Sequence, residues 1–249
     1  MIFLLLALVV LTVLPAQSIP IYHKCYPVSN TPLKLLRKTG YEIGFNERTN
    51  NAEWVGYHVF KCVGNCHYGL PRPRSFLKDP SLNNGITTKD YIRSGYDRGH
   101  LAPNYAISTR YGRFAQKDTF LMSNIVPQKP NLNRGVWYQL EKRIARKWAS
   151  EYKELWILTG SVYLDSKNPQ YIKNKIRIPD AFFKIILDEK NNKPRLMAFL
   201  IPQTAKKSAR IEEYLVSVDR IEELTGIDFF SCLDDSLENQ IESTSQFFD

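Results

Sequence analysis

Hydrophobic positions spaced four apart predict the clearest helix of the chain, at residues 134–152. The apolar members of this repeat are Val136, Leu140, Ile144, Trp148 and Tyr152. Charged residues such as Glu141, Arg143 and Arg146 occupy the other faces of the predicted helix. Asn133 stands where an N-cap residue belongs, because its side-chain oxygen can accept a backbone N–H of the first turn.

Short apolar segments bounded by Gly, Pro and Asn predict the strands. They cover residues 52–61, 155–160, 181–187 and 195–201, and residues 120–126 form a further buried-looking segment. The polar turn at residues 189–193 is expected to join the last two strands as an antiparallel hairpin. Because no internal repeat and no clean linker divides these elements, the simplest architecture is one α+β domain.

The segments between these elements carry weaker patterns. Three prolines and mixed polar residues over residues 19–50 predict an extended arm with little regular structure, and the Gly-, Pro- and Asn-rich residues 64–84 predict a loop. A short helix is expected at residues 219–225, ending at Gly226. The last segment, residues 233–249, holds five acidic residues and no Lys or Arg, which predicts a loosely held acidic tail near the basic surface.

The N-terminal residues have the pattern of a targeting signal. Its first 14 residues are uncharged and almost wholly apolar, and Pro15 to Ser18 add a helix break and small residues. This pattern predicts a signal peptide at residues 1–18, with the mature chain secreted or periplasmic and without stable membrane association. An uncleaved anchor is the alternative, but the apolar run is shorter than the roughly 20 residues that span a bilayer.

Four cysteines follow the predicted signal: Cys25, Cys62, Cys66 and Cys232. An even number in an exported chain favours disulfides, and four cysteines allow three pairings. Cys62 and Cys66 are close enough in sequence to close a small loop, which would leave Cys25 and Cys232 to join the chain ends. A zinc site of Cys62, Cys66 and His67 is the alternative, although neighbouring residues point apart and no fourth ligand is evident.

The net charge indicates which kinds of partner the protein can bind. A hydrophobic content of 43% is that of an ordinary globular protein, whereas a net charge of +9 is not ordinary. Excess positive charge favours polyanions: nucleic acid, an anionic membrane surface or an acidic polysaccharide. Charge alone does not choose among them.

The sequence Asp97–Arg98–Gly99–His100 concentrates candidate chemistry in four consecutive residues. Because Gly99 and the nearby Pro103 disfavour a helix, a strand end that runs into a loop is expected here. Histidine is the side-chain base whose pKa lies nearest neutrality. Taken singly, each residue also suits a structural role, so the case depends on residues further along the chain.

Three downstream residues complete the candidate site: Asn124, Asn133 and Glu141. Eight helical residues at about 100° each return to within about 80° of the same face, so Asn133 and Glu141 can address one site. A neutral amide oxygen beside a carboxylate, without a Cys or His cluster, suits Mg²⁺, which keeps most of its water ligands. Capping for Asn133 and a surface ion pair for Glu141 are the structural alternatives.

Together these motifs resemble the DNA/RNA non-specific endonucleases of the ββα-metal type. The matching segments are RSFLKDP (74–80), DRGHLAPN (97–104), SNIVPQKPNLNRGVWYQLE (123–141), LTGSVY (158–163) and VSVDRIEELTGIDFF (216–230). They lie in the order typical of that family across most of residues 19–232. The resemblance implies a ββα-metal nuclease fold with a central, mainly antiparallel sheet flanked by helices.

The resemblance also implies a role for each matching residue. His100 would be the general base, Asn133 the direct protein ligand of one Mg²⁺ (with Mn²⁺ as a substitute), and Glu141 a ligand through water. Arg98 and Arg74 would contact phosphate. Asn124 would support the site and Asp97 would orient it. The family has a further arginine where this chain has Ala145, and Arg143 or Arg146 would replace it.

The sequence therefore predicts a secreted, Mg²⁺-dependent endonuclease that hydrolyses the phosphodiester bonds of DNA and RNA, and the resemblance allows a homodimer. A catalytically silent cationic module that binds nucleic acid is the main alternative, and a phosphodiesterase for a smaller substrate is a further one. Simple binding would not require a base together with a metal-binding pair.

Overall fold

The computed structural model describes residues 20–64, 66–164 and 167–248. The predicted signal peptide, residues 1–18, lies outside the described residues. Within the described part, no helix combines the length and the apolar character needed to cross a membrane.

A seven-stranded sheet, antiparallel at every pairing, forms the centre of the molecule. Its strands run in the order β12 (Leu215–Val216), β11 (Lys193–Pro202), β10 (Ala181–Lys190), β7 (Glu154–Val162), β4 (Asn51–Phe60), β3 (Tyr41–Asn46) and β2 (Lys34–Lys38). All four predicted strands are present, and β10 and β11 form the predicted antiparallel hairpin. The predicted α+β class with a mainly antiparallel sheet is therefore confirmed.

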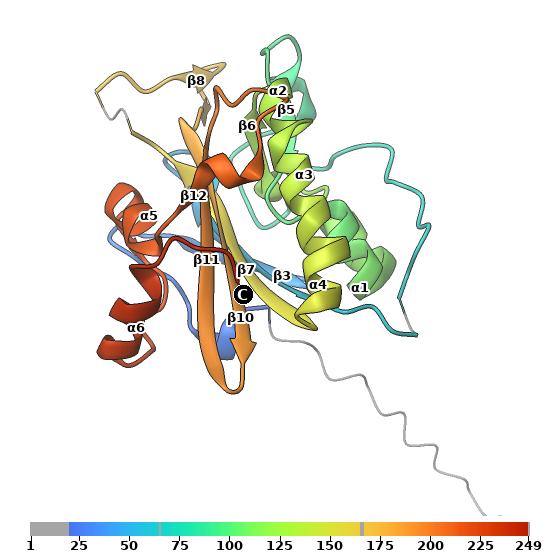
Figure 1. Cartoon of the computed structure of the whole chain (residues 1–249). Coiled ribbons are helices and arrows are strands. Elements are labelled where there is room, and N and C mark those ends of the chain that lie inside the picture. The colour runs from blue at the N-terminus through green and yellow to red at the C-terminus, as the bar shows by residue number, and fades with distance from the viewer. Residues whose placement is uncertain (1–19, 65, 165–166, 249) are drawn as a thin grey trace, which may run out of the picture.

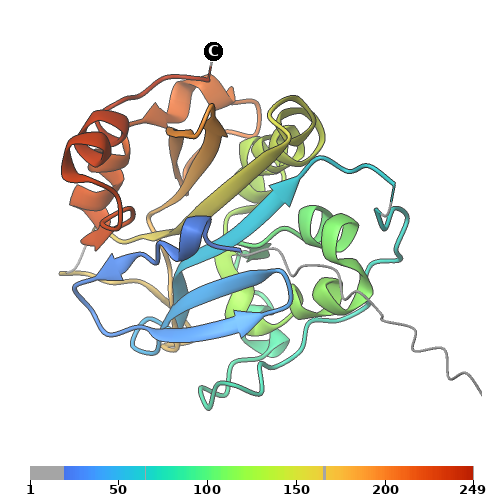
Figure 2. The ribbon, with the colours of Figure 1, turned by 90° about the horizontal axis from the view of Figure 1, so that it is seen from below.

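Helices cover both faces of this sheet (Figure 1), and the view from below in Figure 2 shows the same three layers. One face is covered by α1 (Asn104–Asp118), α2 (Pro130–Asn133), α3 (Val136–Arg143), the π-helical turn η4 (Ile144–Trp148) and α4 (Ala149–Glu151). The other face is covered by α5 (Val218–Thr225), which ends at Gly226 as predicted, and by α6 (Asp235–Glu242). Strand β10 serves both core layers, because Phe182 and Ile186 face the first group of helices and Phe183 and Ile185 face the second.

Short elements complete the described chain. They are η1 (Tyr22–Lys24), β1 (Val28–Ser29), η2 (Thr88–Tyr91), β5 (Asp97–His100), η3 (Met122–Asn124), β6 (Ile125–Gln128), β8 (Tyr171–Ile172), β9 (Ile176–Arg177), η5 (Ile211–Tyr214) and β13 (Ile227–Asp228). Strands β5 and β6 pair with each other and stand apart from the large sheet.

The predicted helix at residues 134–152 is present from Val136 to Glu151, but its N-cap prediction is wrong. Asn133 ends the separate helix α2, and Gly135 occupies the N-cap position of α3. A Cβ at Gly135 would lie 2.2 Å from the backbone oxygen of Asn131, so the chain can make this turn only with glycine. The π-helical turn is wider than an α-turn, which helps to keep a repeat of four residues on the core side.

The extended arm predicted for residues 19–50 is also wrong in part, because β2 and β3 lie within it. Every residue of β3 is buried between its neighbours, and Tyr41, Ile43 and Phe45 enter the core beneath α1 and α3. The three prolines that suggested an arm all precede β2, and the short elements η1 and β1 lie between them.

Two disulfides are present, with the predicted pairing. Cys62 and Cys66 close a small loop, and Cys25 and Cys232 join the N-terminal segment to the chain between β13 and α6. No free cysteine is found among the described residues, which leaves no thiolate for the alternative zinc site.

The C-terminal segment is packed, and the prediction of a loosely held tail is wrong. It forms α6, whose Ile241 enters the second core layer. Beyond α6 the chain places Phe247 and Phe248 against the first core layer, where the ring centroids of Phe247 and Trp148 lie 6.2 Å apart. The apolar residues of this segment therefore outweigh its negative charge in deciding where it lies.

Candidate functional site

The candidate site begins at the β5–β6 pair. Asp97 pairs with Gln128 and His100 with Ile125, and the chain turns after His100 into α1, so the predicted strand end before a loop is confirmed. Asn124 fixes that turn, because its amide accepts a hydrogen bond from Ala102 N–H at 2.8 Å and donates one to the Ala102 oxygen at 3.0 Å. Asn124 is fully buried and does not reach the surface of the site.

A pocket of about 510 Å³ lies between β5, the start of α1, and helices α2 and α3. Four of the predicted site residues line it: Arg98, His100, Asn133 and Glu141. The rest of its wall consists of Arg72, Pro103, Asn104, Tyr105, Ala106, Arg134, Tyr138, Lys142, Ala145 and Arg146. The structure thus brings together residues that are 43 positions apart in sequence, from Arg98 to Glu141.

His100 is held in a mostly apolar setting. Its ring packs edge-on to Phe120, with centroids 5.0 Å apart, and lies 5.4 Å from the ring of Phe76. Burial, followed by the charge of Arg72, lowers the pKa of His100 to about 3. The imidazole is therefore neutral near pH 7, and its buried Nε2 has no hydrogen-bond partner among the described residues. A neutral ring with a free nitrogen in a pocket can accept a proton.

Asp97 holds two residues of the pocket wall, Asn133 and Arg134. It accepts hydrogen bonds from the Asn133 amide nitrogen at 2.9 Å and from the Arg134 guanidinium at 2.8 and 2.6 Å. Burial acts to raise the pKa of Asp97, but the hydrogen bonds from Arg134 and Asn133 outweigh it and lower the pKa. Because the Asn133 nitrogen is engaged by Asp97, the orientation of the amide is set and its oxygen is left for another partner.

Glu141 approaches the site from α3 and faces Lys184 on β10. Burial raises the pKa of Glu141 to about 7, and the charge of Lys184 opposes that shift. Lys184 is fully buried, with its Nζ 3.2 Å from Thr159 Oγ1 and 4.3 Å from the ring centroid of Trp137. The Oε1 atom of Glu141 is buried and unpaired among the described residues. This carboxylate therefore has both a free oxygen and a counter-charge beneath it.

The basic residues of the wall differ in part from those predicted. Arg72 lines the pocket and stacks over Phe120 at 4.8 Å, whereas Arg74, two residues along the same loop, is not part of the pocket wall. Arg98 stacks over Phe76 at 5.0 Å. These stacked guanidinium groups are positioned by aromatic rings while their N–H groups remain available for an anion.

Of the two proposed replacements for the arginine missing at Ala145, only Arg146 lines the pocket, where it stacks over Tyr105 at 4.6 Å. Arg143 instead donates to Glu212 at 2.7 Å.

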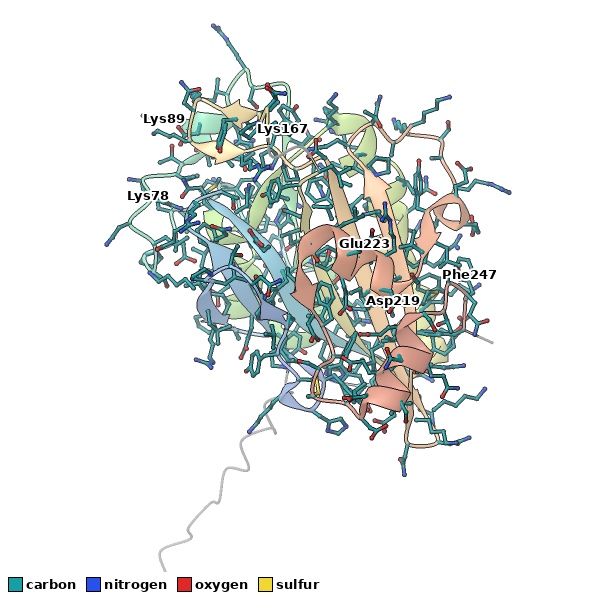
Figure 3. All side chains as sticks on the ribbon, turned by 90° about the vertical axis from the view of Figure 1, so that its left-hand side faces the viewer. Lys78, Lys89, Lys167, Asp219, Glu223 and Phe247 are labelled. Carbon is teal, nitrogen blue, oxygen red and sulfur yellow. A yellow bond between two sulfur atoms is a disulfide. The ribbon has the colours of Figure 1, made fainter. Side chains whose placement is uncertain are left out.

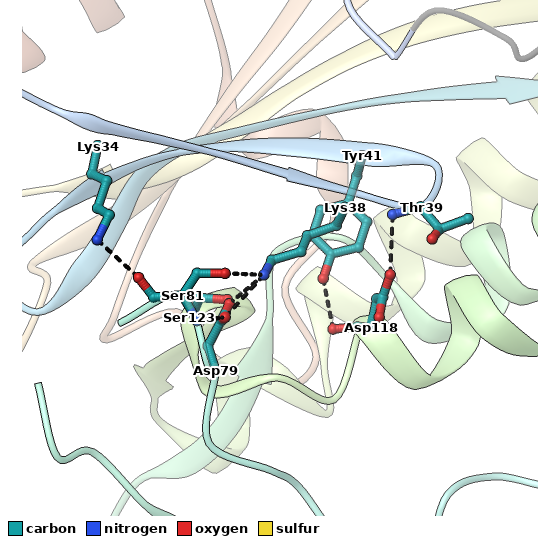
Figure 4. A network of polar contacts seen from close by, with 8 residues as sticks. All are labelled: Lys34, Lys38, Thr39, Tyr41, Asp79, Ser81, Asp118 and Ser123. Atoms are coloured by element: carbon teal, nitrogen blue, oxygen red, sulfur yellow. Dashed lines mark hydrogen bonds and ion pairs between the residues drawn. The ribbon is translucent and has the colours of Figure 1, made fainter. Parts of the chain in front are cut away.

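The loop that carries Arg72 is anchored by a polar network, drawn in Figure 4. Its centre is Asp79, which is 4% exposed and accepts from Lys38 of β2 at 2.7 Å and from Ser123 at 2.5 Å. Lys34 donates to the backbone oxygen of Ser81 at 2.8 Å. The network ties the predicted loop both to the edge of the sheet and to the residue before Asn124.

Three residues of the site were not recognised from the sequence as candidates: Arg72, Asn104 and Lys184. Asn104 ends the motif DRGHLAPN, and its buried Oδ1 is unpaired among the described residues and belongs to the pocket wall. The signal for Asn104 was its place in that motif. A lysine inside the apolar segment AFFKIIL was the signal for Lys184, because a buried lysine needs a partner.

Comparisons with known proteins find relatives that share most of this chain. A nuclease of Nostoc sp. is 33% identical over 236 residues, covering 87% of this chain and 82% of that protein. Mitochondrial endonuclease G of Bos taurus is 31% identical over 209 residues, covering 79% of this chain and 69% of its own. The crystal structure of the EndoG/EndoGI complex, described as showing the mechanism of EndoG inhibition, matches with a TM-score of 0.69 and 25% identity over 80% of this chain and 86% of that one.

The structural similarity to EndoG confirms the predicted ββα-metal nuclease fold. The family model described as "DNA/RNA non-specific endonuclease" matches residues 18–236. This chain therefore belongs to the DNA/RNA non-specific endonucleases, enzymes that hydrolyse phosphodiester bonds.

Proposed function

We propose that this chain is a secreted, Mg²⁺-dependent endonuclease that cleaves DNA and RNA with His100 as the general base. The observation that carries the proposal is the convergence of unpaired buried atoms on one basic pocket: His100 Nε2, Glu141 Oε1 and Asn104 Oδ1. Burying polar atoms without partners is costly, so three such atoms at one pocket favour a polar ligand there.

The residues present fit a hydrated magnesium ion. Asn133 would offer its amide oxygen directly, since Asp97 holds the amide nitrogen, and Glu141 would accept hydrogen bonds from the water ligands. The pocket wall contains no cysteine, and its one histidine is suited to proton transfer. When bound, the ion supplies positive charge for the phosphoryl and leaving oxygens.

His100 would take the proton of the attacking water through Nε2, which its low pKa keeps unprotonated. Arg72, Arg98 and Arg146 would hold the phosphodiester and neutralise the charge that gathers on it. Phosphate contacts carry no sequence information, which supports cleavage without sequence preference. Since these contacts do not depend on the sugar, DNA and RNA are both expected substrates.

The predicted signal peptide at residues 1–18 and the two disulfides support secretion, because disulfides persist in oxidising compartments. The curated relatives include a mitochondrial enzyme, so family membership alone does not choose the compartment. Detection of the mature chain in the culture medium, starting near residue 19, would support export. Retention of an intact N-terminus inside the cell would contradict it.

Plasmid nicking with purified His100→Ala and Asn133→Ala proteins tests the catalytic proposal. A positioned general base contributes about 10²–10⁴-fold in rate, so His100→Ala should lose at least about a hundredfold while still retarding plasmid in a gel. His23→Ala is a matched control, because the His23 side chain is 72% exposed. Full nicking by His100→Ala would overturn the assignment of the general base, and nicking by the parent in EDTA would overturn the metal requirement. Absence of nicking by the parent in Mg²⁺ would favour the silent cationic binder instead.

A further inference from the structure

A second group of candidate ligands lies on the far face of the sheet, between α5 and α6. Asp219 and Glu222 stand three residues apart on α5, so they share one side of that helix. Glu242 comes from the end of α6. One carboxylate oxygen of each residue lies within 4.8 Å of those of the other two. Figure 3 shows Asp219 projecting from α5 on this face of the molecule.

Glu242 shows that the group is more than a chance cluster of surface acids. It is only 4% exposed, and its buried Oε1 has no hydrogen-bond partner among the described residues. An unpaired carboxylate oxygen in the interior needs either a proton or a cation. Because the Glu242 oxygen lies with those of Asp219 and Glu222, the three together offer a site for a cation.

The surroundings of the group add negative charge. Of the ion pairs formed among the described residues, none includes Asp219, Glu222 or Glu242. Glu238 and Asp228 lie close enough to add their negative charge to that of the three carboxylates.

We propose that Asp219, Glu222 and Glu242 form a Ca²⁺ site that joins α5 to α6. The three oxygens lie within 4.8 Å of one another, which is close enough for one ion with calcium–oxygen distances of about 2.3–2.6 Å to bind all three. Ca²⁺ takes six to eight oxygen ligands in a flexible geometry, whereas Mg²⁺ demands a near-ideal octahedron and usually keeps several waters, so a group made only of carboxylates suits calcium better. With no sulfur or nitrogen ligand in the group, zinc is a poorer match.

This site is separate from the pocket of the proposed nuclease reaction, because the central sheet lies between them. It would act on the C-terminal segment. The Cys25–Cys232 disulfide holds the chain just before α6, and a bound ion would hold the last turn of α6 through Glu242. Beyond that turn, Phe247 and Phe248 reach the first core layer. Calcium would thereby stabilise the path of the whole segment.

The test is calcium binding in an Asn133→Ala background, which removes the ligand proposed for the catalytic metal. Titration calorimetry with CaCl₂ should give one ion per chain, with a Kd in the range of about 10⁻⁴–10⁻³ M found for extracellular calcium modules. Adding Glu242→Gln should weaken binding at least about tenfold. Glu223→Gln is the matched control, because Glu223 lies on the same helix, pairs with Arg220 and is outside the group.

Thermal unfolding gives a second readout, because an ion that binds only the folded chain raises Tm with its concentration. Calcium should raise the Tm of the parent and of Glu223→Gln but not that of Glu242→Gln. If Glu242→Gln fails to fold, Asp219→Asn at an exposed position replaces it, with the same expected loss. Absence of calcium binding by the parent, or equal calcium binding by Glu242→Gln or Asp219→Asn, would overturn the proposal and leave a protonated carboxyl as the explanation.

Discussion

Replacing Asp97 by Ala should weaken Mg²⁺ binding at the proposed nuclease site, although Asp97 itself is not expected to touch the ion. Asp97 accepts the Asn133 amide nitrogen at 2.9 Å, and the Asp97 side chain is 16% exposed. A hydrogen bond to a charged group contributes about 1.5–3 kcal/mol. If that bond directs the Asn133 oxygen into the pocket, its loss lowers the affinity for Mg²⁺ by about 10- to 100-fold.

Arg134→Ala provides the comparison that isolates this effect. It removes the other partner of Asp97 and leaves the bond from Asn133 in place. The Arg134 side chain is 66% exposed, so solvent screens its ion pair with Asp97 and the pair contributes little to stability. Asp97→Ala should therefore lose Mg²⁺ affinity, whereas Arg134→Ala should lose only an exposed ion pair.

The assay is plasmid nicking as a function of MgCl₂ concentration. The half-saturating concentration should rise about 10- to 100-fold in Asp97→Ala and less than about threefold in Arg134→Ala, with near-parental rates at saturating Mg²⁺ in both. An unchanged half-saturating concentration in Asp97→Ala would refute the argument that Asp97 orients Asn133. Equal increases in the two variants would refute it as well.

Three further predictions concern charge and packing. The pKa of His100 is lowered to about 3 in the folded chain, so the unfolded chain binds the proton first as pH falls below about 6.5. The free energy of unfolding, measured with urea, should therefore be about 2 kcal/mol lower at pH 5 than at pH 7. His100→Gln should not show this loss. Lys184→Met should raise the pKa of Glu141 further, so this variant should need more Mg²⁺ than the parent for nicking at pH 7 and about as much as the parent at pH 9. An Mg²⁺ requirement equal to that of the parent at both pH values would contradict this. Gly160→Ala should cost about 3 kcal/mol in thermal unfolding, because the added Cβ would lie 1.8 Å from the Glu53 oxygen, and an unchanged Tm would contradict that expectation.

Local patterns predicted the fold where burial alone decides the structure. The sequence predicts the hairpin of residues 181–187 and 195–201 correctly. Its strands are apolar because they pack into both core layers, and its turn is polar because it does not. Strand β2 was missed because its sequence, KLLRK, places mostly exposed side chains at the sheet edge. What makes it a strand is its pairing with β3, which is a long-range contact that no local pattern contains.

In the candidate site, too, local motifs predict some features and long-range contacts decide the others. His100 and Asn133 were found because motifs of adjacent residues carry them. The local pattern predicts the wrong structural role for Asn133, because its side chain is held by Asp97, 36 residues earlier, and does not cap α3. Arg72 and Arg74 are equivalent in sequence, two positions apart on one loop, and only the stacking of Arg72 on Phe120 selects it for the pocket.

The distribution of charge explains how one chain can combine a basic substrate pocket with an acidic group. The pocket wall gathers Arg72, Arg98, Arg134, Lys142 and Arg146 around a single carboxylate, Glu141. The acids of α5 and α6 lie beyond the sheet, behind both core layers. At physiological ionic strength, fields are screened over about 8 Å, so those acids scarcely weaken the attraction of the pocket for a polyanion. The net charge of +9 therefore understates the local charge that a phosphate backbone would meet, and that local charge, more than the total, should set the affinity for nucleic acid.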